Sequence, residues 1–126
     1  MAERHHFSSG SPYEPKIGIS RALRVGDRVL VSGTAPIWPD GSCDPDPAAQ
    51  ARRCFEIITT ALREGGAEPR DVVRTRMFIT DRSYWSEVSR AHGDVFRDVR
   101  PAATCVVTAL LDPLWKVEIE AEAIVP

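Results

Sequence analysis

Apolar residues along this chain follow two different periods, which together predict two helices and five strands. Apolar positions recur at helical spacing from Ala48 to about Glu64 and from about Ser83 to Arg97, so each segment has one apolar stripe. Gly65-Gly66 follows the first segment and is a typical helix end. Short β-rich runs predict strands over residues 19–25, 28–34, 71–80, 103–110 and 116–125. The resulting order, ββαβαββ, predicts a single α+β domain over residues 19–126 with both helices on one face of the sheet.

The predicted strand 71–80 divides its side chains between the two faces of that sheet. Val73 and Met77 are expected on the helix-covered face, together with Val117 and Ile119 of the last strand. The opposite face is expected to carry Val72, Arg74, Arg76, Phe78, Glu118, Glu120 and Glu122. Unpaired buried charges cost several kcal/mol, so these charges must pair across strands or across subunits. Because two helices cover only one face, we expect the other to pack on copies of the chain; a solvated, salt-bridged face is the alternative.

Residues 1–18 are rich in Ser, Gly and Pro and show no period, which predicts an extended, loosely held lead-in. His5 and His6 lack the ligand spacing of a metal site and are interpreted as a disordered surface pair. The three cysteines, Cys43, Cys54 and Cys105, match no zinc or CxxC pattern. Cys54 falls on an apolar helix stripe, so we expect it to be a buried small residue.

Composition and charge narrow the classes of function. The length of 126 residues suits one domain, and a content of 43% hydrophobic and 27% charged residues suits a folded core. The net charge of −2 argues against a strong nucleic-acid binder, which needs clustered Lys and Arg. No apolar run has the length of a membrane helix, and Met1–Ser9 lack the apolar stretch of a secretory signal. We therefore expect a cytoplasmic protein with no membrane partner.

Several short segments occur in an order and spacing typical of a known family. These segments are Ser20–Gly26, Val31–Thr34, Gln50, Gly65–Ala67, Asp71–Thr75, Pro101–Ala102 and Val117–Ala121. Each is weak evidence alone, but their order and spacing together are specific. On these residues, the chain from about Ser20 to Val125 resembles the RidA/YjgF family, whose members are also labelled L-PSP endoribonucleases or translation inhibitors.

The resemblance implies a chorismate-mutase-like fold and a homotrimer whose sheets pack around a central axis. It also implies three clefts between subunits, each able to hold a small carboxylate ligand. In the best-known members of the family, these clefts hydrolyse reactive enamines and imines, such as 2-aminoacrylate, to keto acids and ammonia. We expect no cofactor and no metal.

One position of the family's cleft motif is altered in this chain. The family holds the substrate carboxylate with the arginine of a Pro-Ala-Arg-Ser/Thr motif, whereas this chain has Ala103 at the arginine position, between Pro101-Ala102 and Thr104. An alanine cannot bind a carboxylate, and the lost charge-assisted bond is worth about 1.5–3 kcal/mol. The resemblance also places Ile19 at the family's site tyrosine and Ser89 at its site asparagine. The chain therefore resembles an arginine-lacking branch, and we expect its ligand choice to differ.

The resemblance also implies that this chain keeps other residues of the family's cleft. It implies that Glu120 is the closing glutamate, which would orient water or shuttle protons. It also implies that Phe78 is the aromatic residue that walls the cleft. Backbone groups near Gly33, Ala103 and Thr104 would bind oxygen atoms of the ligand. Further candidates to line the cleft are Thr34, Thr104 and Cys105.

Two arginines are candidates for the missing cation. Arg76 shares a predicted face with Phe78 and Glu120, and Arg100 lies just upstream of Ala103. The favoured interpretation of both is structural, with Arg76 paired to a strand glutamate and Arg100 in solvent. Cys105 is likewise interpreted as a quiet strand cysteine, because no histidine lies near it in the sequence.

Three functions remain open on these grounds. The first is an enzyme, or former enzyme, that acts on small imines, enamines or related carbonyl compounds at the trimer interfaces. The second is a ligand-binding or protein-interaction module that kept the trimer and lost the chemistry. The third is the endoribonuclease or translation-inhibitor activity of the family's older labels, which the acidic balance disfavours.

Overall fold

The computed structural model describes residues 3–126. The strands are β1 (Arg4–Phe7), β2 (Ala22–Val25), β3 (Arg28–Thr34), β4 (Val72–Ile79), β5 (Ala102–Val107) and β6 (Val117–Ile124). The α-helices are α1 (Tyr13–Ile17), α2 (Pro47–Glu64) and α3 (Trp85–Phe96). The predicted order ββαβαββ is confirmed from β2 onward, and β1 and α1 precede it.

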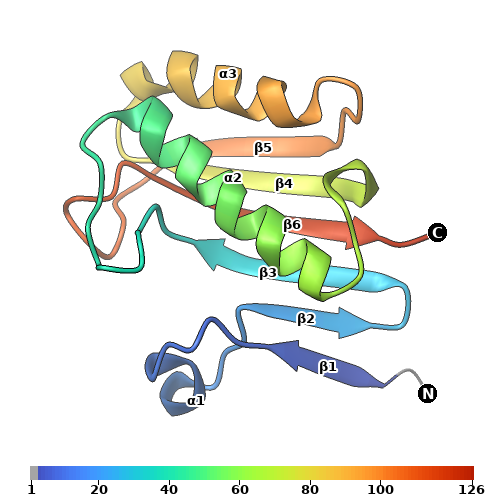
Figure 1. Cartoon of the computed structure of the whole chain (residues 1–126). Coiled ribbons are helices and arrows are strands. Elements are labelled where there is room, and N and C mark those ends of the chain that lie inside the picture. The colour runs from blue at the N-terminus through green and yellow to red at the C-terminus, as the bar shows by residue number, and fades with distance from the viewer. Residues whose placement is uncertain (1–2) are drawn as a thin grey trace.

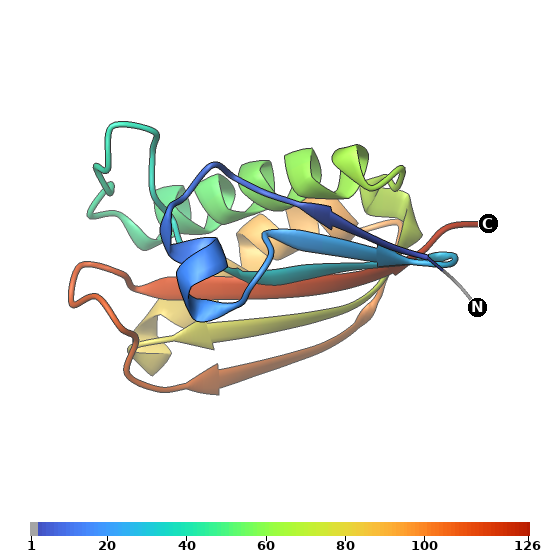
Figure 2. The ribbon, with the colours of Figure 1, turned by 90° about the horizontal axis from the view of Figure 1, so that it is seen from below.

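The six strands form one sheet in the order β1-β2-β3-β6-β4-β5 (Figure 1). Neighbouring strands are antiparallel except β4 and β5, which are parallel. Helix α3 is the crossover that joins this parallel pair, as a parallel connection requires. Both α2 and α3 lie on the same side of the sheet, and neither covers the other side (Figure 2). The expected two-layer arrangement, with one sheet face left open, is therefore confirmed.

Local residue choices account for where the elements begin and end. Gly26 has φ 60° in the two-residue turn between β2 and β3, a conformation that glycine adopts without a steric penalty. Helix α2 begins after Asp46, whose side chain accepts a hydrogen bond from the backbone N–H of Ala49. Pro47 occupies its first position, and the turn at Gly65-Gly66 ends it, with Gly66 at φ 84°.

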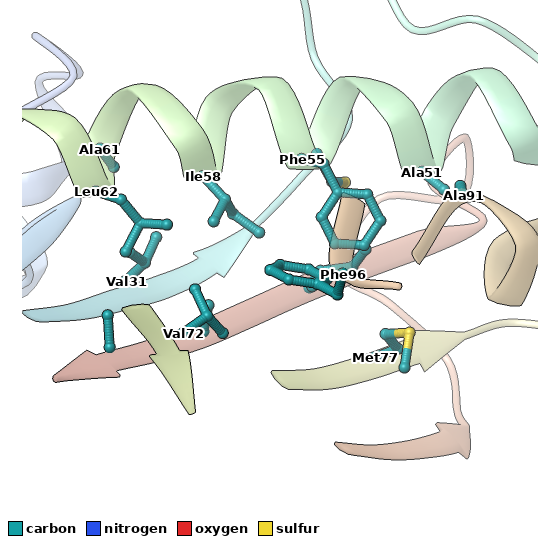
Figure 3. Close-up of a cluster of buried hydrophobic side chains, with 14 of the residues drawn as sticks. Val31, Ala51, Phe55, Ile58, Ala61, Leu62, Val72, Met77, Ala91 and Phe96 are labelled. Atoms are coloured by element: carbon teal, nitrogen blue, oxygen red, sulfur yellow. The ribbon is translucent and has the colours of Figure 1, made fainter. Parts of the chain in front are cut away.

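The hydrophobic core lies between the two long helices and the sheet (Figure 3). Helix α2 contributes the buried Phe55, Ile58 and Leu62, the apolar stripe expected from the sequence. The ring of Phe55 makes an edge-to-face contact with Phe96 of α3, with centroids 5.6 Å apart. Cys54 is fully buried beside them, as predicted.

The start of β4 differs from the predicted alternation. Val72 is buried and Val73 is 41% exposed, the reverse of the expectation for both residues. The cause is a bulge in the pairing with β6, where Val72 opposes Ala123 and Arg74 opposes the next residue, Glu122. One extra residue on β4 reverses the facing of Val73, a change that residue alternation cannot reveal.

The segment before Ile19 was expected to be loosely held, and this is wrong for its described part. Strand β1 pairs with β2 along its whole length, from Arg4 opposite Val25 to Phe7 opposite Ala22. Helix α1 buries the carboxylate of Glu14, which accepts hydrogen bonds from Ser8 and Ser9. Backbone pairing and this polar cluster provide the order that the missing apolar period did not predict. The first two residues lie outside the described part of the chain.

His5 and His6 belong to β1 and are not a disordered pair. Both are exposed, and His6 Nδ1 lies 2.8 Å from Ser20 Oγ. Within residues 3–126, no three His, Cys, Asp or Glu side chains gather in a way that would hold a metal ion.

Candidate functional site

The open face of the sheet carries the cross-strand ion pairs expected from the sequence. Arg76 on β4 lies opposite Glu120 on β6, and its Nη1 is 3.0 Å from Glu120 Oε1 and 3.4 Å from Glu122 Oε1. The hydrogen bond to Glu120 raises the pKa of the Arg76 guanidinium. The structural interpretation of Arg76 is thus confirmed. Glu122 Oε2 also lies 3.6 Å from Arg28 Nη2, so two arginines pair with these two carboxylates on a face that no helix covers.

A cavity of about 440 Å³ opens on this same face. Its lining combines the ion-pair residues Arg76 and Glu120 with the exposed Ile19. Leu23 and Leu30 add apolar surface beside them. Three of the residues singled out from the sequence therefore meet at one concave surface.

Glu118 is two residues before Glu120 on β6, and its side chain lies against the backbone of β3. The pairing of β3 with β6 shifts between Val31 and Thr34, so Gly33 sits in a bulge. A Cβ at Gly33 would overlap Glu118 Oε1, which shows that the carboxylate rests directly over this glycine. Gly33 is therefore required for close approach, and its carbonyl oxygen accepts a hydrogen bond of 2.6 Å from Arg21 Nη2.

The environments of Glu118 and Glu120 differ in a way that matters for proton transfer. Burial raises the pKa of Glu118, against a smaller opposing effect of the Arg21 charge. Glu120 is instead bound to Arg76 at 3.0 Å. A half-buried carboxyl group with a raised pKa accepts a proton more readily than an exposed glutamate, which suits it to proton transfer. Glu118 could not be chosen from the sequence, because it is one of three glutamates that alternate along the last strand. Only its contact with Gly33, in the bulge of β3, distinguishes it from Glu120 and Glu122.

A second cavity, of about 450 Å³, lies at the edge strand β5. Ala103, Thr104 and Cys105 line it as expected. Burial raises the pKa of the Cys105 thiol, which keeps it protonated and fits the interpretation as a quiet cysteine. The remaining lining residues, Met77, Ile79, Arg82, Trp85 and Val107, come from β4, the following turn, α3 and β5.

Five residues singled out from the sequence line neither cavity, namely Gly33, Thr34, Phe78, Ser89 and Arg100. Thr34 is completely buried and its hydroxyl donates to the Ser32 carbonyl, so the expectation that it lines a cleft is wrong. Ser89 on α3 donates its hydroxyl to the carbonyl of Ser86 and lines neither cavity. Arg100 is exposed, as expected, and lies in the loop before β5 with φ 55°.

Phe78 shares the open face with Glu118, because the two residues are directly opposite in the β4–β6 pairing. Ala103, by contrast, is opposite Thr75, whose side chain is buried on the helix-covered face. Glu118 and Ala103 therefore belong to different faces of the sheet, and the two cavities share no residue. Within one chain, the carboxylate and the altered arginine position do not meet.

None of the helices in residues 3–126 combines the length and apolar character needed to span a bilayer.

Comparisons with known proteins agree with the fold and the motifs. The profile of a family described as Endoribonuclease L-PSP matches residues 11–125. The 2-iminobutanoate/2-iminopropanoate deaminase of Escherichia coli K12 is 31% identical over 108 residues, which cover 82% of this chain and 84% of that protein. An uncharacterized protein of Streptomyces coelicolor is 37% identical over 117 residues, covering 91% of this chain and 87% of its own.

A solved structure superimposes over almost the whole molecule. Rv2704 of Mycobacterium tuberculosis, a member of the YjgF/YER057c/UK114 family, matches with a TM-score of 0.89 and 44% identity. The match covers 98% of this chain and 100% of that one. The expected fold is therefore confirmed.

Proposed function

This chain belongs to the endoribonuclease L-PSP family, also called RidA/YjgF, and on that premise we propose that it binds and hydrolyses small imines or enamines in clefts between the subunits of a homotrimer. The observation that carries this proposal is the half-buried Glu118 carboxylate over Gly33, with its raised pKa. A relative is named for the hydrolysis of small 2-imino acids, which is the reaction class such a carboxylate serves.

The candidate residues lie on two different faces of the sheet, which supports a site shared between two copies of the chain. Glu118 and Ala103 lie on different faces of the sheet in one chain, so a cleft that contains both must combine two copies. The open face also leaves Phe78 partly exposed beside three glutamates and Arg76. A copy that packs against this face would cover the aromatic ring and leave the cross-strand ion pairs internally balanced.

The proposed chemistry needs one proton carrier and one water. The Glu118 carboxylate takes a proton from water as the water oxygen bonds to the iminium carbon, which gives a carbinolamine. Protonated Glu118 then returns the proton to the amine nitrogen. As the C–N bond breaks, the hydroxyl proton of the carbinolamine passes through the Glu118 carboxylate to the departing ammonia, so a carbonyl compound and ammonium leave. One water is consumed and no electrons are transferred to or from the substrate. The raised pKa of Glu118 makes its carboxylate a stronger base than an exposed glutamate, which favours the first proton transfer of this cycle.

The alanine at position 103 affects ligand choice within this proposal. Without a cation there, the strand β5 offers a carboxylate only backbone groups and the Thr104 hydroxyl. The loss of one charge-assisted bond weakens a carboxylate ligand by about 1.5–3 kcal/mol. If no other residue supplies a cation, small 2-imino acids are expected to be poorer substrates here than in relatives that keep the arginine.

The test is imine hydrolysis by the purified protein. An amino-acid oxidase generates 2-iminobutanoate in the presence of semicarbazide, and a drop in semicarbazone formation reports hydrolysis. We expect the wild type to lower that signal and Glu118→Gln to lose about 100-fold or more of the rate, the usual contribution of general acid–base catalysis. Glu122→Gln is the matched control, because Glu122 lies on the same strand face and contacts Arg76 and Arg28.

The proposal fails in two distinct ways. A wild-type protein that does not accelerate the reaction, but binds the keto-acid product, is the ligand-binding module that lost the chemistry. A wild-type rate that Glu118→Gln and Glu122→Gln reduce equally contradicts the role of Glu118.

A further inference from the structure

We propose that Arg82 binds the carboxylate of the ligand in the cavity beside Ala103, in place of an arginine at position 103. This inference rests on the proposed function and names the specificity of the same site. It moves the ligand-binding cation from the edge strand β5 to the turn that follows β4. Arg76 and Arg100 were the candidate cations from the sequence, both with a favoured structural interpretation, and the geometry points to neither.

Arg82 shares a cavity with the altered position. The cavity of about 450 Å³ is lined by both Arg82 and Ala103, and Arg82 is the only charged residue in its lining. Within one chain no carboxylate lines this cavity, and in the proposed cleft the Glu118 carboxylate of the next copy would face the same ligand, so Arg82 would supply the only opposing charge from this lining. Arg76 lines the other cavity, and Arg100 lines neither.

The guanidinium of Arg82 has no ion-pair or hydrogen-bond partner within residues 3–126, whereas Arg76 is held by two glutamates. Its neighbour Asp81 forms no ion pair with it: Asp81 Oδ1 accepts a hydrogen bond of 2.8 Å from the backbone N–H of Ser83, and the Arg82 charge only contributes to lowering the pKa of Asp81. That bond caps the short 3₁₀ turn Arg82–Tyr84 and fixes the backbone from which Arg82 projects. Arg82 is therefore anchored at its backbone and unoccupied at its charged end.

The rest of the cavity selects for a small acid with an apolar body. Met77 and Ile79 form its floor and are 2% and 1% exposed, so this surface is apolar and firmly packed. Trp85, 45% exposed, adds an aromatic wall next to Arg82. An arginine fork binds a carboxylate through two parallel hydrogen bonds, and the apolar floor accommodates a short hydrocarbon chain. The cavity thus fits a short-chain carboxylic acid, and the proposed function narrows this class to 2-oxo or 2-imino acids.

The experiment measures how much of the ligand's affinity depends on its carboxylate. Amide ¹H–¹⁵N NMR titrations of the wild-type protein use 2-oxobutanoate and its uncharged counterpart 2-butanone as probes. We expect Arg82→Gln to weaken 2-oxobutanoate by about tenfold or more, the effect of one charge-assisted bond, and to leave 2-butanone unchanged. Arg100→Gln is the matched control and should change neither titration, because Arg100 is exposed and outside the cavity.

A second variant tests whether Arg82 takes the place of an arginine at position 103. Ala103→Arg in the Arg82→Gln background should restore the affinity for 2-oxobutanoate, because it returns a guanidinium to the other side of the same cavity. Restoration also shows that the loss in Arg82→Gln is a loss of charge and not of folding.

Two results overturn the inference while the proposed function stands. One is an Arg82→Gln protein that binds 2-oxobutanoate as the wild type does, and the other is an equal loss of both probes. If the wild type binds neither probe and does not hydrolyse 2-iminobutanoate, the inference and the proposed function both fall.

Discussion

Glu118 and Gly33 depend on one another. The glycine has no Cβ, so the carboxylate can rest over the backbone of β3, where burial raises its pKa. Arg21 holds the same glycine from the other side through its carbonyl oxygen. Glu118, Gly33 and Arg21 thus lie together in one polar cluster. The raised pKa of Glu118 depends on Gly33, because a Cβ at that position would exclude the carboxylate.

The substitution Gly33→Ala tests this unit at the scale of one residue. The new methyl group overlaps only the far end of the Glu118 side chain, so we expect the chain to fold and Glu118 to swing towards water. Its pKa then falls to the ordinary range of a glutamate, because burial is the main cause of its increase. A ¹³C-carboxyl NMR titration measures the shift, with the Glu122 carboxyl as internal control. An unchanged Glu118 pKa in Gly33→Ala would refute the contact.

Position 103 could be interpreted from the sequence, whereas Glu118 and Arg82 could not. Ala103 is recognisable because a short motif surrounds it and β5 begins within one residue of the predicted strand, although it ends at Val107 and not at residue 110. Glu118 belongs to a regular alternation of glutamates in which nothing local distinguishes one from the next. Arg82 becomes a candidate ligand-binding residue only because it lines the cavity together with residues of β4, α3 and β5. Site residues that depend on a bulge or on packing between elements need the structure.

Helix α3 joins the sheet through a polar contact within an aromatic cluster. His92 Nε2 lies 2.8 Å from the hydroxyl of Thr75, a fully buried residue of β4. The imidazole ring also packs on Phe55 and Phe96, with centroids 5.8 and 4.8 Å away. Burial among these groups lowers the pKa of His92. The contact therefore favours the neutral imidazole, which makes the docking of α3 sensitive to acid.

This contact predicts a pH dependence of stability. The folded state holds His92 with a pKa below the model-peptide value of about 6.5, so the unfolded chain takes up the proton first as the pH falls. Stability from this residue is complete above about pH 6.5 and declines as the pH drops towards the folded pKa. Urea unfolding at about pH 7.5 and about pH 5.5 should show a smaller loss for His92→Gln than for the wild type. Equal losses in both proteins would show that His92 does not contribute to the acid sensitivity.

At the scale of elements, long periodic segments were predictable and short paired ones were not. Helix α2 runs from Pro47 to Glu64, within a residue of the expected segment, because its apolar stripe and end signals agree. Strand β1 has no apolar period, since its order comes from backbone pairing with β2. The bulge at Val73 was invisible for a related reason, because it depends on the partner strand and not on the residues of β4 alone.

At the scale of the whole molecule, one feature governs the rest: both long helices lie on the same side of the sheet (Figure 2). The uncovered face holds Phe78, Glu118 and the Arg76 ion pairs, and β5 carries Ala103 at the sheet edge. In the proposed function, these two regions of one chain are the two halves of the shared cleft. Three copies around an axis would cover the open face and bring the half with Glu118 to the half with Ala103 and Arg82 of the next copy.

The solution mass of the protein tests this account most directly, because a site divided between copies requires the copies to associate. Sedimentation equilibrium at micromolar concentration should give a mass about three times the 13.9 kDa of one chain. That mass should not change as the concentration is varied around the range used for the hydrolysis assay. A mass of one or two chains under those conditions would contradict the shared cleft.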